Sequence, residues 1–489
     1  MREAIMKKLI FILLNVLILS GLVFAQSDPP KSAGSKIIES MKFGEIELNI
    51  PEVGRDVERV VMDNGIVIYL YEDHALPLFN IYTSIRCGAI YDPAEKDGLS
   101  EIVGRVMRTG GTKTIGGDSL NILLEYIGGS LETGIGDEVG SASLSLLAKD
   151  IDLGLKLYAD LLRNPAFPQD QIDLVKEEIK NRIKRRNDKP GDITRRYFNQ
   201  ILYEDHPFGR VQEWATIKSI TRDDLEQYHK RFFVPNNIMI GVAGDFNAPE
   251  IIAKLKKFLG DWKKSDSPIP EVPAVQATYH PGVYQIKKDI NQANIRIGLL
   301  GIKRDNPDRY AIDLMNYILG GGSFTSRLTS KVRSDEGLAY SVGSRFYTDG
   351  RDFGTFFAYT QTKSSTAYKA VSLMLEEIKK IRDEGVTEAE LAEARNSTIN
   401  RFIFNFDNSG EIVRNLMSLE YDGYPLDYYN HYLGYYRSVT LDDIKRVAGE
   451  YLKPEEMSII LIGNPELYEK PMDEFGPITN IELVNPNIE

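Results

Sequence analysis

An internal repeat constrains the fold of this chain more than any other feature of its sequence. Thr221–Leu225 and Thr440–Ile444 read Thr-x-Asp-Asp-apolar and lie 219 residues apart, and each precedes a helix-like stretch and then an apolar strand. Two amphipathic stretches, 167–182 and 386–401, share this offset. Because ordered matches at a nearly constant offset indicate duplication, we expect two halves with the same architecture.

Each half combines alternating strand patterns with longer helices. Residues 99–110 and 311–322 are apolar helical patterns that end in glycine-rich turns, and their offset of 212 residues points to a small insertion between the repeats. Coincidence among similar α/β segments is the alternative to duplication. Consecutive strands followed by helix pairs predict an α+β fold of two tandem α/β sandwich domains, each a mostly antiparallel sheet with helices on one face. The expected strands are 65–71, 79–86 and 237–244 in the first half and 295–301, 353–360 and 457–463 in the second.

The N-terminus has the order of a secretory signal peptide. Lys7 and Lys8 precede an apolar run over residues 9–23, and the small side chains of Val23 and Ala25 suit cleavage after Ala25. An uncleaved membrane anchor is the alternative, but the run is short for a membrane span. We therefore expect an exported protein, periplasmic or extracellular, with no stable membrane anchor.

The domain organisation follows from the repeat and this signal. A segment rich in Ser and Pro, with few apolar runs, separates the two halves and is the natural linker. The predicted parts are a signal peptide at 1–25, an arm at 26–55, a first domain at 56–264, a linker at 265–281, a second domain at 282–470 and a tail at 471–489.

Composition excludes several kinds of site. A formal net charge of −12 argues against a nucleic-acid surface, which needs clustered Lys and Arg. One cysteine allows neither an internal disulfide nor a cysteine zinc site. Five histidines are present, but no two have the close spacing with which a helix presents a metal-binding pair. They are His74, His206, His229, His280 and His431.

The order of several short motifs resembles the insulinase/pitrilysin-type (M16) zinc peptidases, especially the bacterial members and those similar to mitochondrial processing peptidase. The resemblance covers about residues 55–470 and implies that the two domains form half of a clamshell. No single motif is specific, but their order and spacing together are. The motifs are Asp63-Asn64-Gly65, Gly110-Gly111-Thr112, His206–Gly209, Ala243-Gly244-Asp245, Gly320–Ser323 and Arg333 through Gly337–Tyr340.

The resemblance implies a metal site that this chain has lost. In the family the first helix carries His-x-x-Glu-His, whose two His side chains bind zinc and whose Glu accepts a proton from the metal-bound water. The matching positions here are Glu101, Gly104 and Arg105, and Glu178 matches the distal zinc ligand. Since a guanidinium is always protonated, Arg105 cannot ligate zinc. We expect no metal in this chain, and an ion pair between Arg105 and Glu178 where the metal would lie.

A second departure concerns the strand to which substrate adds in active relatives. Its counterpart lies at 128–139, where Gly134 and Gly136 weaken a strand edge. We expect a loop around these glycines that need not hold a peptide.

The second half keeps residues that the resemblance assigns to substrate binding. Arg333 and Tyr340 provide a guanidinium and a phenol, which are donors for a substrate carbonyl and act most strongly on the oxyanion of a tetrahedral intermediate. The alternative is that Arg333 pairs with Asp335 or Glu336 on the surface while Tyr340 packs in the core. The family also uses the glycine loop before them to hold substrate in non-catalytic subunits: Gly320, Gly321 and Gly322.

These features together predict an exported, non-catalytic subunit of an insulinase-type metallopeptidase heterodimer. The partner subunit would carry the zinc, and the pair would hydrolyse peptides or unfolded segments. The acidic charge would favour basic or neutral peptides through long-range steering, unless it serves solubility alone. The alternative is a purely structural or peptide-binding protein, like the core subunits of respiratory complexes, with no role in proteolysis. A self-sufficient enzyme would require metal ligands that the sequence lacks.

Overall fold

The computed structural model describes Gly34 and residues 49–489. The predicted signal peptide at 1–25 and most of the predicted arm at 26–55 lie outside these residues. Ile50–Glu489 form one compact unit. Within the described residues, no helix is both long enough and apolar enough to cross a membrane.

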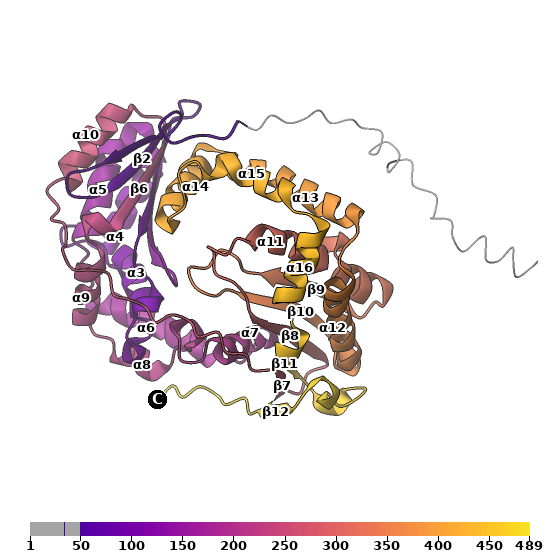
Figure 1. Cartoon of the computed structure of the whole chain (residues 1–489). Helices are drawn as coiled ribbons and strands as arrows, with labels where there is room; N and C mark the ends of the chain where they lie inside the picture. The colour runs from indigo at the N-terminus through magenta and orange to yellow at the C-terminus, as the bar shows by residue number, and fades with distance from the viewer. Residues whose placement is uncertain (1–33, 35–48) are drawn as a thin grey trace, which may run out of the picture. The chain divides into compact units, whose positions relative to one another are not determined.

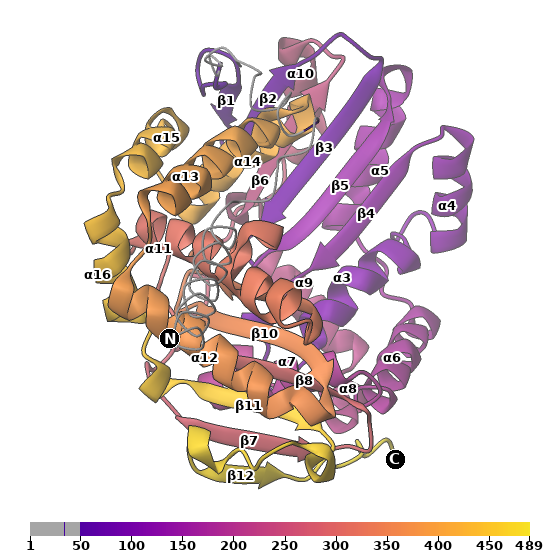
Figure 2. The same cartoon turned by 90° about the vertical axis from the view of Figure 1, so that its right-hand side faces the viewer.

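The first half is built on a six-stranded sheet (Figure 1), whose strand order β1-β2-β6-β3-β5-β4 can be followed in Figure 2. Neighbouring strands are antiparallel except β2 and β6, which are parallel. The strands are β1 (Glu58–Val61), β2 (Val67–Glu72), β3 (Leu78–Ile85), β4 (Ser130–Ile135), β5 (Gly140–Leu147) and β6 (Ile238–Gly244).

The second half repeats this plan with the strand order β12-β7-β11-β8-β10-β9. Here β7 is parallel to both β11 and β12, and the other neighbours are antiparallel. The predicted tail at 471–489 contributes β12 to this sheet, and the predicted linker at 265–281 contains no helix or strand. The strands are β7 (Gly282–Lys287), β8 (Gln292–Leu300), β9 (Ala339–Phe346), β10 (Thr355–Lys363), β11 (Ser458–Gly463) and β12 (Ile478–Ile481).

Strand side chains alternate between two faces, and each face has its own apolar partners. In the first sheet Ile68 and Leu70 point into the larger core under the helices of the same half, whereas Tyr69 points to the opposite face. This arrangement of two mixed sheets with packed helices confirms the predicted α+β fold. Apart from one helix described below, the helices of the first half are α3 (Leu99–Gly110), α4 (Gly117–Tyr126), α5 (Ile151–Arg163), α6 (Gln169–Lys184), α8 (Trp214–Ser219), α9 (Arg222–Phe232) and α10 (Ala248–Leu259).

The helices of the second half follow the same order up to β11, after which a short 3-10 turn at Pro465–Leu467 takes the place of α10. The helix corresponding to α3 changes to π-helical geometry over Tyr317–Gly321, and a second π-helical segment covers Thr329–Asp335. The π-helical turns carry the glycine loop and Arg333 toward β9. The α-helices are α11 (Arg309–Asn316), α12 (Ala367–Glu384), α13 (Glu388–Phe402), α15 (Tyr428–Ser438) and α16 (Leu441–Tyr451).

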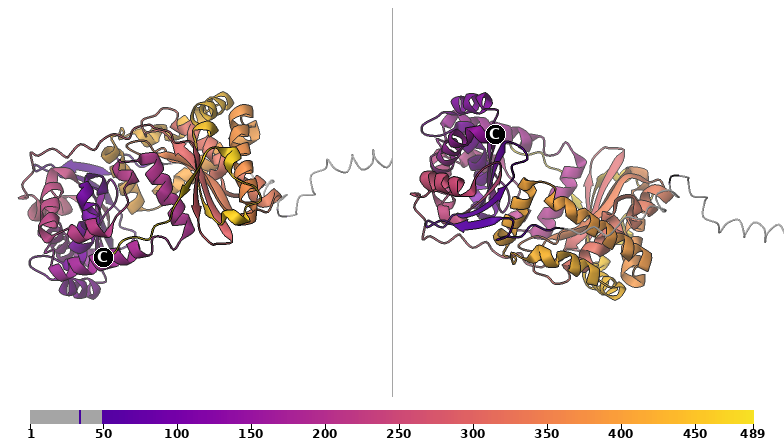
Figure 3. Two further views of the ribbon diagram at one scale, coloured as in Figure 1. Left: turned by 90° about the horizontal axis from the view of Figure 1, so that it is seen from below. Right: turned by 90° about the horizontal axis from the view of Figure 1, so that it is seen from above.

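The two halves exchange a helix, which the repeat did not predict. Helix α7 (Pro190–Tyr203) packs on the second sheet, and α14 (Ser409–Asp422), which lies 219 residues later, packs on the first (Figures 2 and 3). Each sheet is thus covered on its second face by a helix from the other half, in addition to the helices predicted for one face. The buried contacts join Ile193, Phe198 and Leu202 to Ile286, Phe357 and Ile460, and Val413, Leu416 and Met417 to Tyr69, Met239 and Ala243.

Candidate functional site

Helix α3 carries the positions that match the family's zinc motif. The helix begins after Gly98, whose φ of 98° lies in the left-handed region that glycine tolerates. The buried Asp92 carboxylate accepts hydrogen bonds at 3.1 Å from the backbone N–H groups of Gly98 and Ser100, which satisfies donors at the helix start. Burial raises the pKa of Asp92 to about 7, despite these hydrogen bonds.

An ion-pair network occupies the region where the metal ligands would converge. The predicted contact between Arg105 and Glu178 is present, and it joins α3 to α6. Arg182, also on α6, donates two hydrogen bonds of 2.6 Å to the two carboxylate oxygens of Glu101. Gln212 donates to Glu101 at 3.2 Å. Glu101 and Arg105 therefore stand where the family motif has its two imidazoles, and each pairs with an oppositely charged side chain of α6.

The network fixes Glu101 in its charged form. Burial acts to raise the pKa of Glu101, but the hydrogen bonds from Arg182 and Gln212 and the charges of Arg182 and Arg105 outweigh it, so this pKa is lowered. The hydrogen bonds to Glu101 likewise raise the pKa of Arg182. Both oxygens of Glu101 are thus committed to a bidentate pair, the strongest form of charged hydrogen bond.

Gly104 shows that the missing general base cannot simply be added back. A Cβ atom at this position would lie 2.6 Å from the backbone nitrogen of Ile135 and 3.0 Å from the carbonyl carbon of Gly134. The Thr133 hydroxyl donates a 2.6 Å hydrogen bond to the carbonyl oxygen of Gly104. Strand β4 therefore lies directly against the position of the family's catalytic glutamate.

Strand β4 corrects the prediction of a loop around Gly134. The residue lies inside β4 and pairs with Ser141 of β5, and the strand ends only at Ile135. Gly136 starts the turn that follows. The ladder to β5 and the close contact with Gly104 keep this edge strand ordered, although Gly134 has no side chain to pack.

The donor set does not fit zinc. Among the described residues, no group of three His, Cys, Asp or Glu side chains could hold a metal ion. A ring nitrogen of the buried His229 lies 2.8 Å from the carbonyl oxygen of Leu162, and burial lowers its pKa to about 4. In the turn that contains His206, its ring accepts the backbone N–H of Phe208 at 3.2 Å. Both of these histidines have structural roles.

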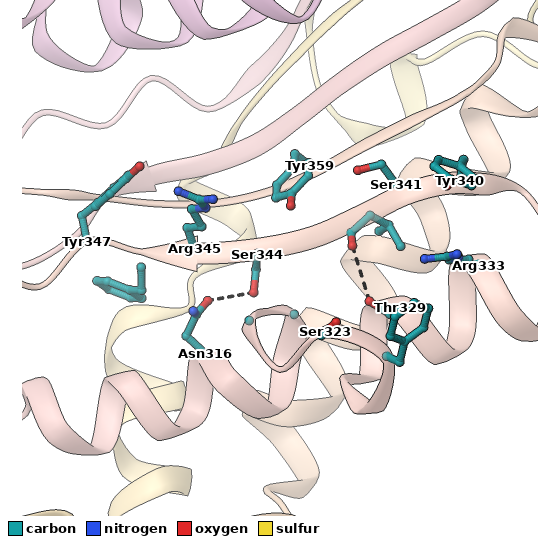
Figure 4. Close-up of a pocket in the computed structure, with 15 residues that line it drawn as sticks. Asn316, Ser323, Thr329, Arg333, Tyr340, Ser341, Ser344, Arg345, Tyr347 and Tyr359 are labelled. Carbon is teal, nitrogen blue, oxygen red and sulfur yellow. Dashed lines mark hydrogen bonds between the residues drawn. The ribbon is translucent and has the colours of Figure 1, made fainter. Parts of the chain in front are cut away.

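The second half contains a cleft of about 540 Å³ that brings together most of the predicted substrate-binding residues (Figure 4). Arg333, Tyr340, Gly320 and Gly321 line it, whereas Gly322 is absent from its lining. A Cβ atom on Gly320 would lie 2.3 Å from the backbone nitrogen of Ser344, so the glycine allows the loop to approach β9 as Gly104 approaches β4.

Arg333 and Tyr340 face each other at the mouth of this cleft. The guanidinium carbon lies 5.1 Å from the centre of the Tyr340 ring and 4.8 Å from that of Phe324. Within residues 49–489 no carboxylate forms an ion pair with Arg333, and Glu336 pairs instead with Lys369. Tyr340 is 86% exposed. The structure thus contradicts the alternative of a surface pair for Arg333 and a core position for Tyr340.

Sequence reasoning missed several residues that line the same cleft. Arg345 and Tyr347 follow Tyr340 along β9 and the turn after it, and Tyr359 lies on the neighbouring β10. Asn316 accepts a 2.7 Å hydrogen bond from the Ser344 hydroxyl on the other side of β9. The only sequence signal for them was that residues 343, 345 and 347 lie on one face of a strand, because strand side chains alternate between faces. This pattern does not show what that face contacts.

Two family models match the chain in succession. The model described as insulinase (peptidase family M16) matches residues 70–212, and the model described as the peptidase M16 inactive domain matches residues 219–398. These matches cover both sheets in part and include the positions of the ion-pair network and of the cleft.

Curated relatives and solved structures agree with these matches. An uncharacterized zinc protease of Mycobacterium leprae is 25% identical over 69% of this chain and 76% of its own length. A non-peptidase homolog, YmxG, of Helicobacter pylori is 25% identical over 81% of this chain and 91% of its own. The crystal structure of a peptidase M16 inactive domain from Pseudomonas fluorescens superposes with a TM-score of 0.76 at 23% identity, covering 83% of this chain and 98% of that one.

Proposed function

Because the chain belongs to the insulinase (M16) family of peptidases, we propose that it is a non-catalytic subunit that acts with a zinc-bearing member of the family. In this proposal the partner subunit holds the metal and cleaves the peptide bond. This chain helps to bind the peptide or unfolded segment. The signal-like residues 1–25 support export, so both subunits would act outside the cytoplasm.

The ion-pair network on α3 carries the proposal. Arg182 and Arg105 engage the carboxylates of Glu101 and Glu178, and Gly104 leaves no room for a general base against β4. A metal site could form only if both pairs broke, and a general base at position 104 would require β4 to move. The packing around Gly104, as well as the residue types, therefore supports the proposal that this chain does not catalyse hydrolysis alone.

The cleft next to β9 supports the second part of the proposal, peptide binding. The Tyr340 side chain is exposed and Arg333 is half-buried, and neither donor group has an acceptor among the described residues. Such donors suit a peptide carbonyl, and they would stabilise an oxyanion at the partner's metal more than they stabilise the ground-state carbonyl. We therefore assign substrate binding to Arg333, Tyr340 and the loop with Gly320 and Gly321, and Gly322 would keep the conformation of this loop.

The proposal is tested by measuring peptide hydrolysis in three samples. They are this chain alone, a zinc-bearing M16 chain from the same genome, and the mixture of the two. We expect no activity and no stoichiometric zinc for this chain, and higher activity for the mixture than for the partner alone. Arg333→Ala and Tyr340→Phe should each lower kcat of the mixture by roughly a hundredfold, as for the loss of one oxyanion donor. Tyr126→Phe is the matched control, because Tyr126 is 87% exposed but lies on α4, away from the cleft.

Two outcomes would change the assignment. Hydrolysis by this chain alone that a chelator abolishes would overturn the non-catalytic role. Unchanged kcat in both variants would instead favour the second candidate, a structural or peptide-binding protein without a role in cleavage. The observation behind this second candidate is the same cleft, whose donors can hold a peptide whether or not it is cleaved.

A further inference from the structure

A half-buried arginine without a counter-ion lies beside the cleft. Arg296 projects from β8, and its guanidinium carbon is 4.0 Å from the ring centre of Phe357 and 5.4 Å from that of Phe198 on α7. Within residues 49–489 its side chain makes no hydrogen bond and no ion pair, and its Nε atom is buried without a partner. The guanidinium carbon lies over both rings, which offer no oxygen acceptor, so the N–H donors of Arg296 have no hydrogen-bond acceptor within residues 49–489.

Two further arginines face Arg296 instead of carboxylates. Burial, together with the neighbouring charges of Arg195 on α7 and Arg345 on β9, lowers the pKa of Arg296 to about 10, although Tyr347 and Tyr359 act in the opposite direction. Arg195 is only weakly paired, with Asp192 at 3.3 Å, and Arg345 has no ion pair within the described residues. Tyr347 and Tyr359 line the same cavity as Arg296, and their hydroxyl groups add two hydrogen-bond donors.

The arginines belong to a cavity of about 930 Å³ that adjoins the substrate cleft. Arg345, Tyr347 and Tyr359 line both spaces, so a peptide in the cleft can extend from Tyr340 along β9 to Arg296. Figure 4 shows Arg345 and Tyr359 on one side of β9, opposite the side that Ser344 presents to Asn316.

Two carboxylates of this cavity pair with cations outside the arginine cluster. Asp349 pairs with Arg309 at 2.7 Å, and Asp352 pairs with Lys303 at 2.8 Å. The charged groups that act most strongly on Arg296 are the two arginines. The other acidic residues that line the cavity are Asp97, Asp137 and Glu138.

We propose that Arg296, Arg195 and Arg345 bind the carboxylate of an acidic side chain in a peptide that occupies the cleft. The inference rests on the proposed peptide binding and adds a substrate class to it. A planar carboxylate matches the in-plane donors of Arg296, and a carboxylate would supply the counter-charge that the folded chain leaves out. The charge immediately around Arg296 thus favours an acidic side chain at this position, opposite to the preference expected from the net charge of −12.

The anion site can be tested by measuring peptide affinity with fluorescence anisotropy on the whole chain without a partner. One labelled, unstructured peptide carries glutamates, and the other is the same peptide with glutamines in their place. We expect the glutamate peptide to bind about tenfold more tightly, in line with a charge-assisted hydrogen bond. Arg296→Gln and Arg345→Gln should each remove most of this preference and leave the glutamine peptide within about twofold of the wild type. Because Arg345 is exposed, its variant remains informative if Arg296→Gln fails to fold.

The control and the contrary results separate this inference from the proposed function. Arg437→Gln removes the same charge from an exposed position on α15 and should leave the preference intact. If neither peptide binds the wild type, the proposed peptide binding itself fails. If both peptides bind equally, or if Arg437→Gln has the same effect, only the anion site is overturned. Inorganic phosphate is a competitor in the same assay. If phosphate displaces the glutamate peptide and has the higher affinity of the two, the site is assigned to a free oxyanion instead.

Discussion

At the scale of single residues, Gly104 matters through the side chain that it lacks. The strand β4 packs against its Cα, and the Thr133 hydroxyl donates to its carbonyl oxygen. The neighbouring ion pairs of Glu101 with Arg182 and of Arg105 with Glu178 then close the space beside it. The three departures from the family motif therefore act together. Glu101 and Arg105 supply charges that form ion pairs, and Gly104 allows α3 and β4 to pack in direct contact.

Gly104→Ala should lower the free energy of unfolding by about 1–3 kcal/mol, the usual cost of overpacking. The reason is that the added methyl would lie within 3.1 Å of three backbone atoms of β4, none of which can rotate away. Urea denaturation followed by circular dichroism measures the difference.

Gly449→Ala is the matched control for this substitution. Gly449 lies in α16 with no heavy atom within 4 Å of an added Cβ. Alanine there should raise the free energy of unfolding by about 0.5–1 kcal/mol, because it restricts the unfolded chain and favours the helix. If Gly104→Ala proved as stable as the wild type, the close packing of α3 on β4 would be refuted.

At the scale of elements, the repeat reproduces local structure down to single hydrogen bonds. Helices α9 and α16 both begin with a capping box, in which Thr221 and Thr440 accept the backbone N–H of Asp224 and Asp443 at 3.3 and 3.2 Å. In each case the aspartate carboxylate accepts a hydrogen bond from the backbone N–H of the threonine. The two helices thus start by the same chemistry at equivalent places in the two halves.

Thr221→Ala and Thr440→Ala should each destabilise the protein by about 1 kcal/mol, the typical cost of losing an N-cap oxygen. Thermal unfolding of each variant, compared with Thr221→Ser and Thr440→Ser, isolates the hydroxyl because serine keeps it. A loss at one threonine with none at the other would show that the two caps are not equivalent in energy.

At the scale of the whole molecule, the exchanged helices join the two halves into one unit. Helix α7 leaves the first half to cover the second sheet, and α14 does the reverse. The guanidinium of Arg59 on β1 also donates hydrogen bonds of 2.6 and 2.7 Å to Glu420 on α14. Unfolding either sheet would therefore expose the apolar face of a helix that belongs to the other half, which favours cooperative unfolding.

Tryptophan fluorescence can test this coupling, because both tryptophans, Trp214 and Trp262, lie in the first half. Leu461→Ala in β11 removes a fully buried side chain from the core of the second half and should cost about 2–5 kcal/mol. We expect the fluorescence midpoint in urea to fall together with the circular dichroism midpoint.

Leu144→Ala in β5 is the control, since it lies in the core of the first half and must shift the fluorescence directly. Should Leu461→Ala leave the fluorescence transition in place while circular dichroism shifts, the two halves unfold independently.

Part of the candidate site was predictable because its residues lie on one element or repeat a local pattern. The spacing of Glu101, Gly104 and Arg105 places them on neighbouring faces of one helix, and the family resemblance added Glu178. The short segment from Arg333 to Tyr340 could likewise be placed beside a glycine loop. The bidentate pair of Glu101 with Arg182 was missed, because Arg182 lies one helical turn after Glu178 and no motif marks it.

By itself, the sequence determined several of the helices and strands of this protein and their duplication, because periodic apolar residues, capping threonines and turn glycines act over a few neighbouring residues. It also determined that the metal-binding side chains are absent. Only the tertiary structure decided which sheet α7 and α14 cover, that β4 rests on Gly104, and that Arg195, Arg296 and Arg345 converge beside the cleft. Those contacts join residues up to several hundred positions apart, and their energies depend on burial and shape that no local pattern encodes.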